Sequence, residues 1–121
     1  MGYEVKMIVG ITGNYRGPLG TYYTAVDAMI ELEKLTYDQN DPLNILIRES
    51  HRRDASGQRC HFYLGSEIQE EDKYDEVMTA VSRESVIRAM EKTKNPGQRI
   101  KWALALLRTM PDDRIVLFYG H

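Results

Sequence analysis

Four glycines and one arginine stand between two apolar-periodic segments near the start of the chain. Residues 3–11 alternate apolar and polar side chains, which predicts a strand, and residues 21–35 place apolar side chains at helical spacing. Backbone N–H groups at such a junction, together with the helix dipole, favour an anion, and Arg16 could add a bidentate grip. The glycine loop 10–21 therefore predicts a site for a phosphorylated small molecule or a nucleotide. Its predicted ligand-binding residues are Gly13, Asn14, Arg16, Gly17, Gly20 and Thr21.

The spacing of these glycines matches no specific phosphate motif. A P-loop ends in Gly-Lys-Ser/Thr, and Gly20-Thr21 lacks the lysine; the dinucleotide pattern Gly-x-Gly-x-x-Gly is also absent. The segment 16–20 resembles the coenzyme-A pyrophosphate loop of acetyltransferases, which also joins a strand to a helix. Its glycine spacing differs from that loop, and no function is inferred from the resemblance. The favoured alternative is a turn-rich connection in which the glycines adopt positive φ and Pro18 stiffens the path.

A second candidate site lies between two further alternating segments, residues 43–47 and 60–64. Both read as strands, and the turn signal Asp54-Ala55-Ser56-Gly57 between them predicts a β-hairpin with a long tip. Basic side chains at this tip could contact a nucleic-acid backbone, with aromatic residues 61–63 as a stacking platform. The alternative, which we favour, is a solvated tip whose charges prevent edge pairing. The predicted nucleic-acid-binding residues are Arg48, His51, Arg52, Arg53 and Arg59.

Metal and nucleophile chemistry have weak support in the sequence. The three histidines, His51, His61 and His121, show no paired ligand spacing, so no metal site is predicted. An acidic block at 67–76 lacks the spacing of a calcium loop and reads as a solvated helix start or a docking face. The single cysteine, Cys60, excludes an internal disulfide and reads as a small buried hydrophobe. No cofactor is predicted, and whether the chain is an enzyme stays open.

The remaining segments complete a coarse fold prediction. Ser82 reads as the N-cap of a helix over 82–90, and Asn95-Pro96 reads as the start of a helix that ends near 110. Residues 114–119 are apolar enough for a central strand, whereas residues 65–81 allow either a strand or a short helix. The resulting order predicts one α+β domain over residues 1–121. We expect a ferredoxin-like (split β-α-β) fold with a four-stranded, mainly antiparallel sheet and a helical, acidic insertion before the last helix. In that arrangement the first and last strands lie side by side.

Composition places the chain among globular proteins. It has 121 residues, of which 42% are hydrophobic and 28% charged, and a formal net charge of −2. No apolar run has the length of a membrane span, and the single cysteine favours a reducing, cytoplasmic setting. We expect a small cytoplasmic binding or regulatory module that acts through a protein partner or self-association. The eight tyrosines and six methionines favour a homo-oligomer, because both residue types are enriched at interfaces.

Overall fold

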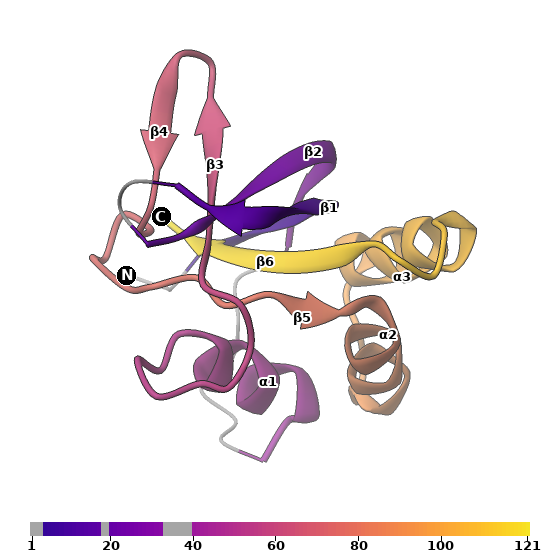
Figure 1. Cartoon of the computed structure of the whole chain (residues 1–121). Helices are drawn as coiled ribbons and strands as arrows, with labels where there is room; N and C mark the ends of the chain where they lie inside the picture. Colours follow the sequence, from indigo (N-terminus) through magenta and orange to yellow (C-terminus); the bar gives the residue numbers. More distant parts are fainter. Residues whose placement is uncertain (1–3, 18–19, 33–39) are drawn as a thin grey trace.

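The structure, a computed structural model, describes residues 4–17, 20–32 and 40–121. In these residues a six-stranded mixed sheet is accompanied by three helices (Figure 1). The strands are β1 (Val5–Arg16), β2 (Tyr22–Glu31), β3 (Cys60–Leu64), β4 (Glu67–Gln69), β5 (Val81–Ser82) and β6 (Ile115–Gly120). The helices are α1 (Pro42–Ser50), α2 (Arg83–Lys92) and α3 (Gln98–Thr109).

The expected ferredoxin-like fold is wrong. The sheet has the order β4-β3-β2-β1-β6-β5, with six strands in place of four, and its β2–β3 pair is parallel. No helix connects β1 to β2 in the described residues, so the split β-α-β unit is not formed. One element of the expectation is confirmed: β1 and β6 lie side by side and pair antiparallel from Val5↔Gly120 to Gly10↔Ile115.

The predicted helix over residues 21–35 is a strand, β2, from Tyr22 to Glu31. The ladder with β1 pairs Val9 with Ala28 but the next residue, Gly10, with Val26, so Asp27 is an extra residue in a β-bulge. A bulge shifts the alternation of a strand by one residue. Residues that share a face before and after the bulge are then three positions apart instead of two, and a spacing of three is also typical of a helix. Residues 33–35 of the predicted helix lie outside the described residues.

The predicted strand over residues 43–47 is a helix, α1. Asp41 caps it by accepting the backbone N–H of Leu43 at 3.0 Å, and Pro42 occupies the first turn. Leu43 and Ile47, four residues apart, face the core, which satisfies the helical period as well as the strand period suggested by the sequence. Because α1 replaces the first strand, the predicted β-hairpin with a basic tip at 48–59 does not exist.

The segments after residue 60 are closer to expectation. A strand at 60–64, a helix after Ser82 and a terminal strand are all confirmed. The Ser82 hydroxyl accepts the backbone N–H of Ser85 at 3.2 Å, as an N-cap should. The start of α3 was predicted too early, since its N-cap is Gly97, and Asn95 adopts φ 49°, outside the helix.

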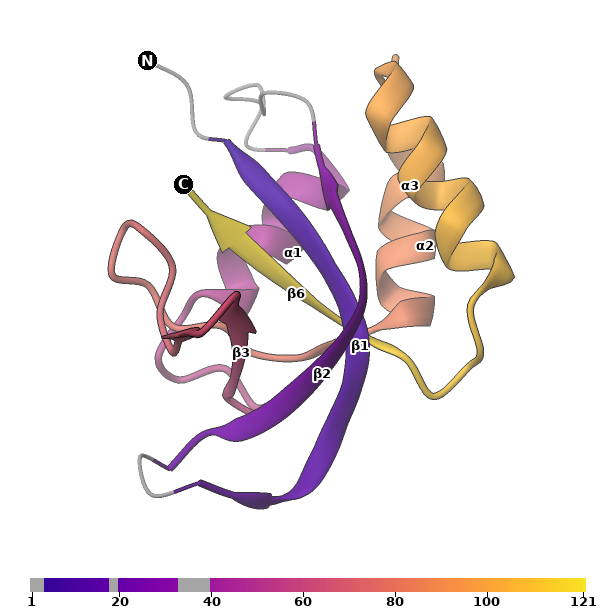
Figure 2. The same cartoon turned by 90° about the horizontal axis from the view of Figure 1, so that it is seen from above.

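Each face of the sheet has its own core. All three helices pack on one face, where Val5, Met7 and Phe118 of the central strands join apolar residues of α1, α2 and α3. The opposite face carries a second buried cluster, which consists of Ile8, Cys60, Phe62, Met78, Leu117 and Tyr119. In Figure 2, α2 and α3 lie beside the sheet, and β1 and β2 continue together beyond them.

The second cluster is enclosed because the sheet closes on itself. The backbone N–H of Tyr22 in β2 donates to the Arg59 carbonyl at 2.9 Å. On its other side, the start of β3 pairs with the segment that leads into β5: Arg59 forms an antiparallel bridge with Thr79, and the Cys60 N–H donates to the Met78 carbonyl at 2.9 Å. Since β5 in turn pairs with β6, strands β1, β2, β3, β5 and β6 surround the cluster.

The connection from β4 to β5, which the sequence left unassigned, is an ordered loop organised by Asp72. Its side chain is buried and accepts the backbone N–H groups of Tyr74 (2.8 Å), Glu76 (3.0 Å) and Gly120 (3.2 Å). The carboxylate thus both shapes the loop and fastens it to β6.

Across the described residues, none of the helices combines the length and apolarity that crossing a membrane requires.

Gly10 is the position where the β1–β2 ladder tolerates no side chain. A Cβ there would overlap the Ala25 carbonyl oxygen and lie 3.0 Å from Thr24 Cγ2. We expect Gly10→Ala to destabilise the fold by about 2 kcal/mol or more, because the obstacle is backbone rather than a flexible side chain. Gly13→Ala is the matched control, since its nearest neighbour would be the Tyr23 carbonyl oxygen at 3.6 Å, and it should change stability by less than about 0.5 kcal/mol. Urea unfolding of both variants checks this, and equal stabilities would contradict it.

Candidate functional site

The glycine loop joins two strands, not a strand to a helix. Its turn is held by the Gly17 N–H donating to the Thr21 carbonyl at 2.8 Å and the Gly20 N–H donating to the Gly17 carbonyl at 3.0 Å. Gly20 adopts φ 83°, a conformation that favours glycine, as expected for the turn-rich alternative. The helix dipole invoked for anion binding is therefore absent from this loop.

A cleft of about 420 Å³ nevertheless lies beside this turn. Arg16, Gly20 and Tyr22 line it from the hairpin, residues 55–59 line it from the loop before β3, and Thr79 lines it from the segment before β5. The strand ladder explains why these residues meet. Arg16 of β1 pairs with Tyr22 of β2, and the Tyr22 N–H donates to the carbonyl of Arg59, which directly precedes β3, so the two arginines flank one tyrosine.

The charge of this cleft is positive. Its described lining contains two arginines and no Asp, Glu, His or Lys. The Arg16 guanidinium lies over the Tyr22 ring, 5.7 Å from its centroid, and Arg59 Nη2 donates to the Arg53 carbonyl at 3.1 Å. Neither contact neutralises a guanidinium, so each retains donors for an anion.

A neighbouring cleft of about 410 Å³ has the opposite character. Arg53 and Arg59 line it, but so do four acids, which are Glu70, Glu71, Asp72 and Asp75. Arg53 pairs there with Glu71 at 3.2 Å. Within the described chain, the cleft that Arg16 and Arg59 share is thus the better place for an anion.

The six predicted ligand-binding residues are only partly brought together. Arg16 and Gly20 line the positive cleft, whereas Gly13 and Asn14 lie along β1 and Gly17 forms the turn; none of these three is among the lining residues. Thr21 is buried, and its hydroxyl is hydrogen-bonded to His61 Nδ1 at 2.8 Å.

The predicted basic nucleic-acid surface is dispersed. Arg48 lies on α1, and His51 is the buried C-cap of that helix, with Nδ1 2.9 Å from the Val77 carbonyl. Arg52 pairs with Asp54 through two hydrogen bonds, and Arg53 pairs with Glu71. Only Arg59 of the five reaches the positive cleft. The absence of the hairpin explains the difference.

An exposed aromatic and aliphatic face, which we term the outer face, lies on the outside of strands β1 to β4. Register places its members on one side: Ile11 opposite Ala25, Tyr23 opposite His61, and Tyr63 opposite Ile68. Tyr23 and Tyr63 are 46% and 48% exposed, and their ring centroids are 5.9 Å apart. The ring of His61, which is buried, lies 5.8 Å from that of Tyr23 and 6.1 Å from that of Tyr63.

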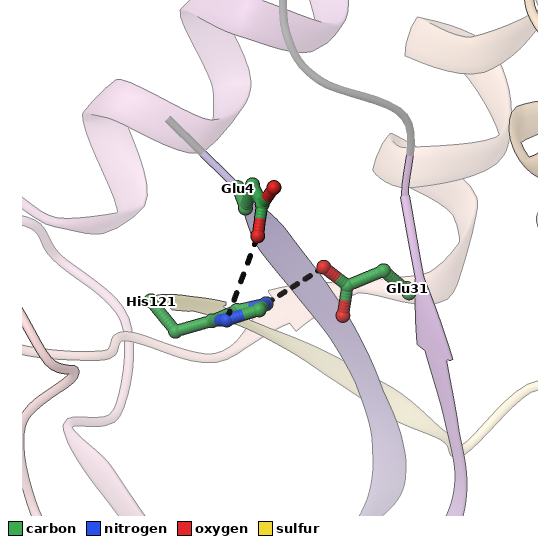
Figure 3. A group of neighbouring side chains, drawn as sticks. All are labelled: Glu4, Glu31 and His121. Atoms are coloured by element: carbon green, nitrogen blue, oxygen red, sulfur yellow. Dashed lines mark hydrogen bonds and ion pairs between the residues drawn. The ribbon is translucent and has the colours of Figure 1, made fainter. Parts of the chain in front are cut away.

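Glu4, Glu31 and His121 meet at the far end of the sheet (Figure 3). His121 Nε2 lies 2.7 Å from Glu31 Oε1, and His121 Nδ1 lies 4.0 Å from Glu4 Oε2. Sequence reasoning missed this group, because the three residues have no ligand spacing along the chain. A signal existed: Glu4 and His121 flank the two strands that were expected to be neighbours.

Cys60 is fully buried, and its Sγ donates to the Gln58 carbonyl at 3.3 Å. Burial raises the pKa of the Cys60 thiol above its ordinary value, an effect that the neighbouring Thr24 and Thr12 hydroxyls only partly offset. The thiol is thus packed as a small hydrophobe, as the sequence suggested.

Searches against known protein families, curated proteins and solved structures find no match to this chain. The function must therefore be argued from the geometry alone.

The environment of Cys60 predicts an unreactive thiol. Native protein at pH 8 should react with a thiol reagent such as dithionitrobenzoate at least ~100-fold more slowly than protein in urea, since the thiol is both protonated and inaccessible. Absorbance of the released thionitrobenzoate follows the reaction. Stoichiometric labelling of the native protein at the unfolded rate would contradict the prediction.

Proposed function

We propose that this chain is a small-molecule-binding domain whose ligand carries a phosphate group, held in the cleft between Arg16 and Arg59. The observation that supports it is that two arginines line one cleft whose described lining has no acid. Guanidinium groups match the oxygen geometry of phosphate and hold it through two parallel hydrogen bonds.

The size and chemistry of the cleft suit a small ligand. Its volume falls within the range of about 300–1,000 Å³ that small-molecule sites occupy. The Ser56 and Thr79 hydroxyls and the Gln58 amide are further hydrogen-bonding groups in the lining, and Tyr22 supplies an aromatic ring. Because the described lining holds no Asp, Glu, His or Lys to act as a general base, the arrangement supports binding rather than a reaction.

Removal of either arginine tests this function. In a thermal-shift panel of pyrophosphate, ADP, cyclic AMP and coenzyme A, at least one compound should raise the melting temperature of the wild type. Arg16→Ala and Arg59→Ala should each weaken that ligand by about 10- to 100-fold, as loss of a charged hydrogen-bonding group costs about 1.5–3 kcal/mol.

Arg88→Ala is the matched control, because it removes an exposed arginine of α2 that does not line the cleft. It should leave ligand affinity unchanged. If no compound of the panel binds, or if Arg88→Ala weakens binding as much as the two cleft variants, the proposed function is wrong.

A second candidate function is self-association through the outer face. Isolated exposed apolar residues are ordinary, but here Ile11, Tyr23, Tyr63 and Ile68 occupy one face in register. Tyrosine is enriched at interfaces, and the rings of both tyrosines contact the buried His61. A second copy of the chain is the partner that this candidate names.

Light scattering coupled to gel filtration tests the outer face. The wild type should elute as a dimer, and Tyr63→Lys should weaken the dimer by about 30-fold or more, the effect of losing a central aromatic contact and burying a charge. Trp102→Lys is the control, since Trp102 on α3 is 57% exposed but lies on a different element. A monomeric wild type would exclude this candidate, and a dimer broken only by Trp102→Lys would place the interface on α3.

A further inference from the structure

Glu4, Glu31 and His121 approach one another from three adjacent strands. Glu4 directly precedes β1, Glu31 ends β2 and His121 directly follows β6, and these strands are neighbours in the order β2-β1-β6. One ligand atom from each side chain lies within 4.8 Å of the other two. Figure 3 shows one dashed line from each ring nitrogen of His121, one to the carboxylate of Glu4 and the other to that of Glu31.

The histidine is held in place by contacts outside this group. Its backbone N–H donates to the Glu4 carbonyl at 2.9 Å, and its carbonyl oxygen accepts the Tyr74 hydroxyl at 2.9 Å. Its ring also stacks on Tyr119, with centroids 6.5 Å apart and planes inclined by 21°. Tyr119 is itself buried and donates its hydroxyl to Gln69 Oε1 at 2.8 Å. The imidazole is therefore presented to the carboxylates by a rigid support, as ligand histidines require.

The charges of the group suit a cation. Two carboxylates this close repel each other less when a positive charge, either a protonated imidazole or a bound cation, lies beside them. Lys6, which lies opposite Glu31 in the ladder, forms no ion pair with either carboxylate in the described part of the chain. With a neutral imidazole the three side chains carry a formal charge of −2, which a divalent ion would balance.

We infer that Glu4, Glu31 and His121 form a binding site for a divalent first-row transition metal such as Zn²⁺. One imidazole nitrogen and two carboxylate oxygens form the mixed donor set that suits these ions, whereas Mg²⁺ and Ca²⁺ prefer oxygen alone. The metal would lie between His121 Nε2 and Glu31, in place of their direct hydrogen bond. Glu4, whose side chain is 53% exposed, can turn from Nδ1 toward the same ion.

Three protein ligands leave coordination positions open. The side chains of Glu31 and His121 are 29% and 26% exposed, so solvent reaches the site. Such an arrangement fits an exchangeable ion that retains water or a ligand of a partner, rather than a closed structural site with four protein ligands. The site is separate from the arginine cleft, which lies at the opposite end of β1.

Titration calorimetry of the full chain with ZnCl₂ tests the site. Wild-type protein should bind one Zn²⁺, and Glu31→Gln and His121→Gln should each weaken binding by about tenfold or more, because each removes a ligand. Glu67→Gln is the control: it removes one exposed acid of β4 outside the group and should leave the affinity unchanged. Lys6→Met should strengthen binding, because it removes a neighbouring positive charge.

A second measurement locates the ion. Mn²⁺ added to labelled protein should broaden the amide resonances of residues at this end of β1, β2 and β6 first, and Zn²⁺ should reverse the effect. Circular dichroism of Glu31→Gln checks that this variant keeps the fold, so that a loss of binding cannot come from unfolding. Absence of wild-type binding at 1 mM Zn²⁺, or equal affinity in wild type, Glu31→Gln and His121→Gln, would overturn the inference.

Discussion

The short antiparallel bridge between Arg59 and Thr79 is the contact on which the arrangement of the sheet depends. It is flanked by hydrogen bonds from the Cys60 N–H to the Met78 carbonyl and from the Ala80 N–H to the Gln58 carbonyl, at 2.9 and 2.8 Å. Without this bridge, the start of β3 would expose an edge, and the cluster around Phe62 would face solvent. Gly57 makes the approach possible, since a Cβ there would lie 2.7 Å from Thr79 Cγ2 and 2.8 Å from the Ala80 carbonyl oxygen. The same closure brings residues 55–59 against the β1–β2 turn, so the positive cleft is a product of the fold rather than of a local motif.

Sequence periodicity predicted the elements whose residues fit only one period and failed where a strand period and a helix period both fit. The strand at 60–64, the helix predicted over 82–90 and the terminal strand predicted over 114–119 each have one dominant pattern, and each exists within one or two residues of the predicted bounds. In β2 the bulge at Asp27 converts a strand period into an apparent helical one, and a bulge cannot be recognised without knowing the partner strand. In residues 43–47 alternation and helical spacing both fit, and the deciding signal was local. Asp41-Pro42 is a good N-cap and first-turn pair, and it outweighs five residues of alternation.

The candidate sites were likewise hard to predict, because each is formed by residues that are far apart in the sequence. Arg16 and Arg59 were each identified from the sequence, but for unrelated reasons, one as part of a glycine loop and the other as part of a basic hairpin. Neither reason survives in the structure, because the loop leads into a strand and the hairpin is a helix followed by a loop. What unites the two arginines is strand pairing across β1, β2 and β3. The Glu4, Glu31 and His121 group was missed for a related reason. The expected pairing of β1 with β6 could bring Glu4 and His121 together, but Glu31 joins them only because residues 22–31 form strand β2 beside β1.

Strand β1 separates the positive cleft at one end of the sheet from the Glu4, Glu31 and His121 group at the other. Arg16 ends the strand and Glu4 precedes it, so the path along the strand between the positive cleft and the carboxylate–imidazole group is about 40 Å at about 3.3 Å per residue, and the curvature of β1 makes the direct distance shorter (Figure 2). Direct electrostatic interaction over such a distance is screened in physiological salt, where the Debye length is about 8 Å. Any coupling between the two ends would have to pass through the β1–β2 ladder. This ladder has two irregular points: one register shift after Val9 and another between Thr12 and Arg16. The first of these coincides with Gly10, where the backbones are packed too closely for a side chain. Because screening leaves little direct interaction between the two ends of the sheet, we expect them to bind their ligands independently.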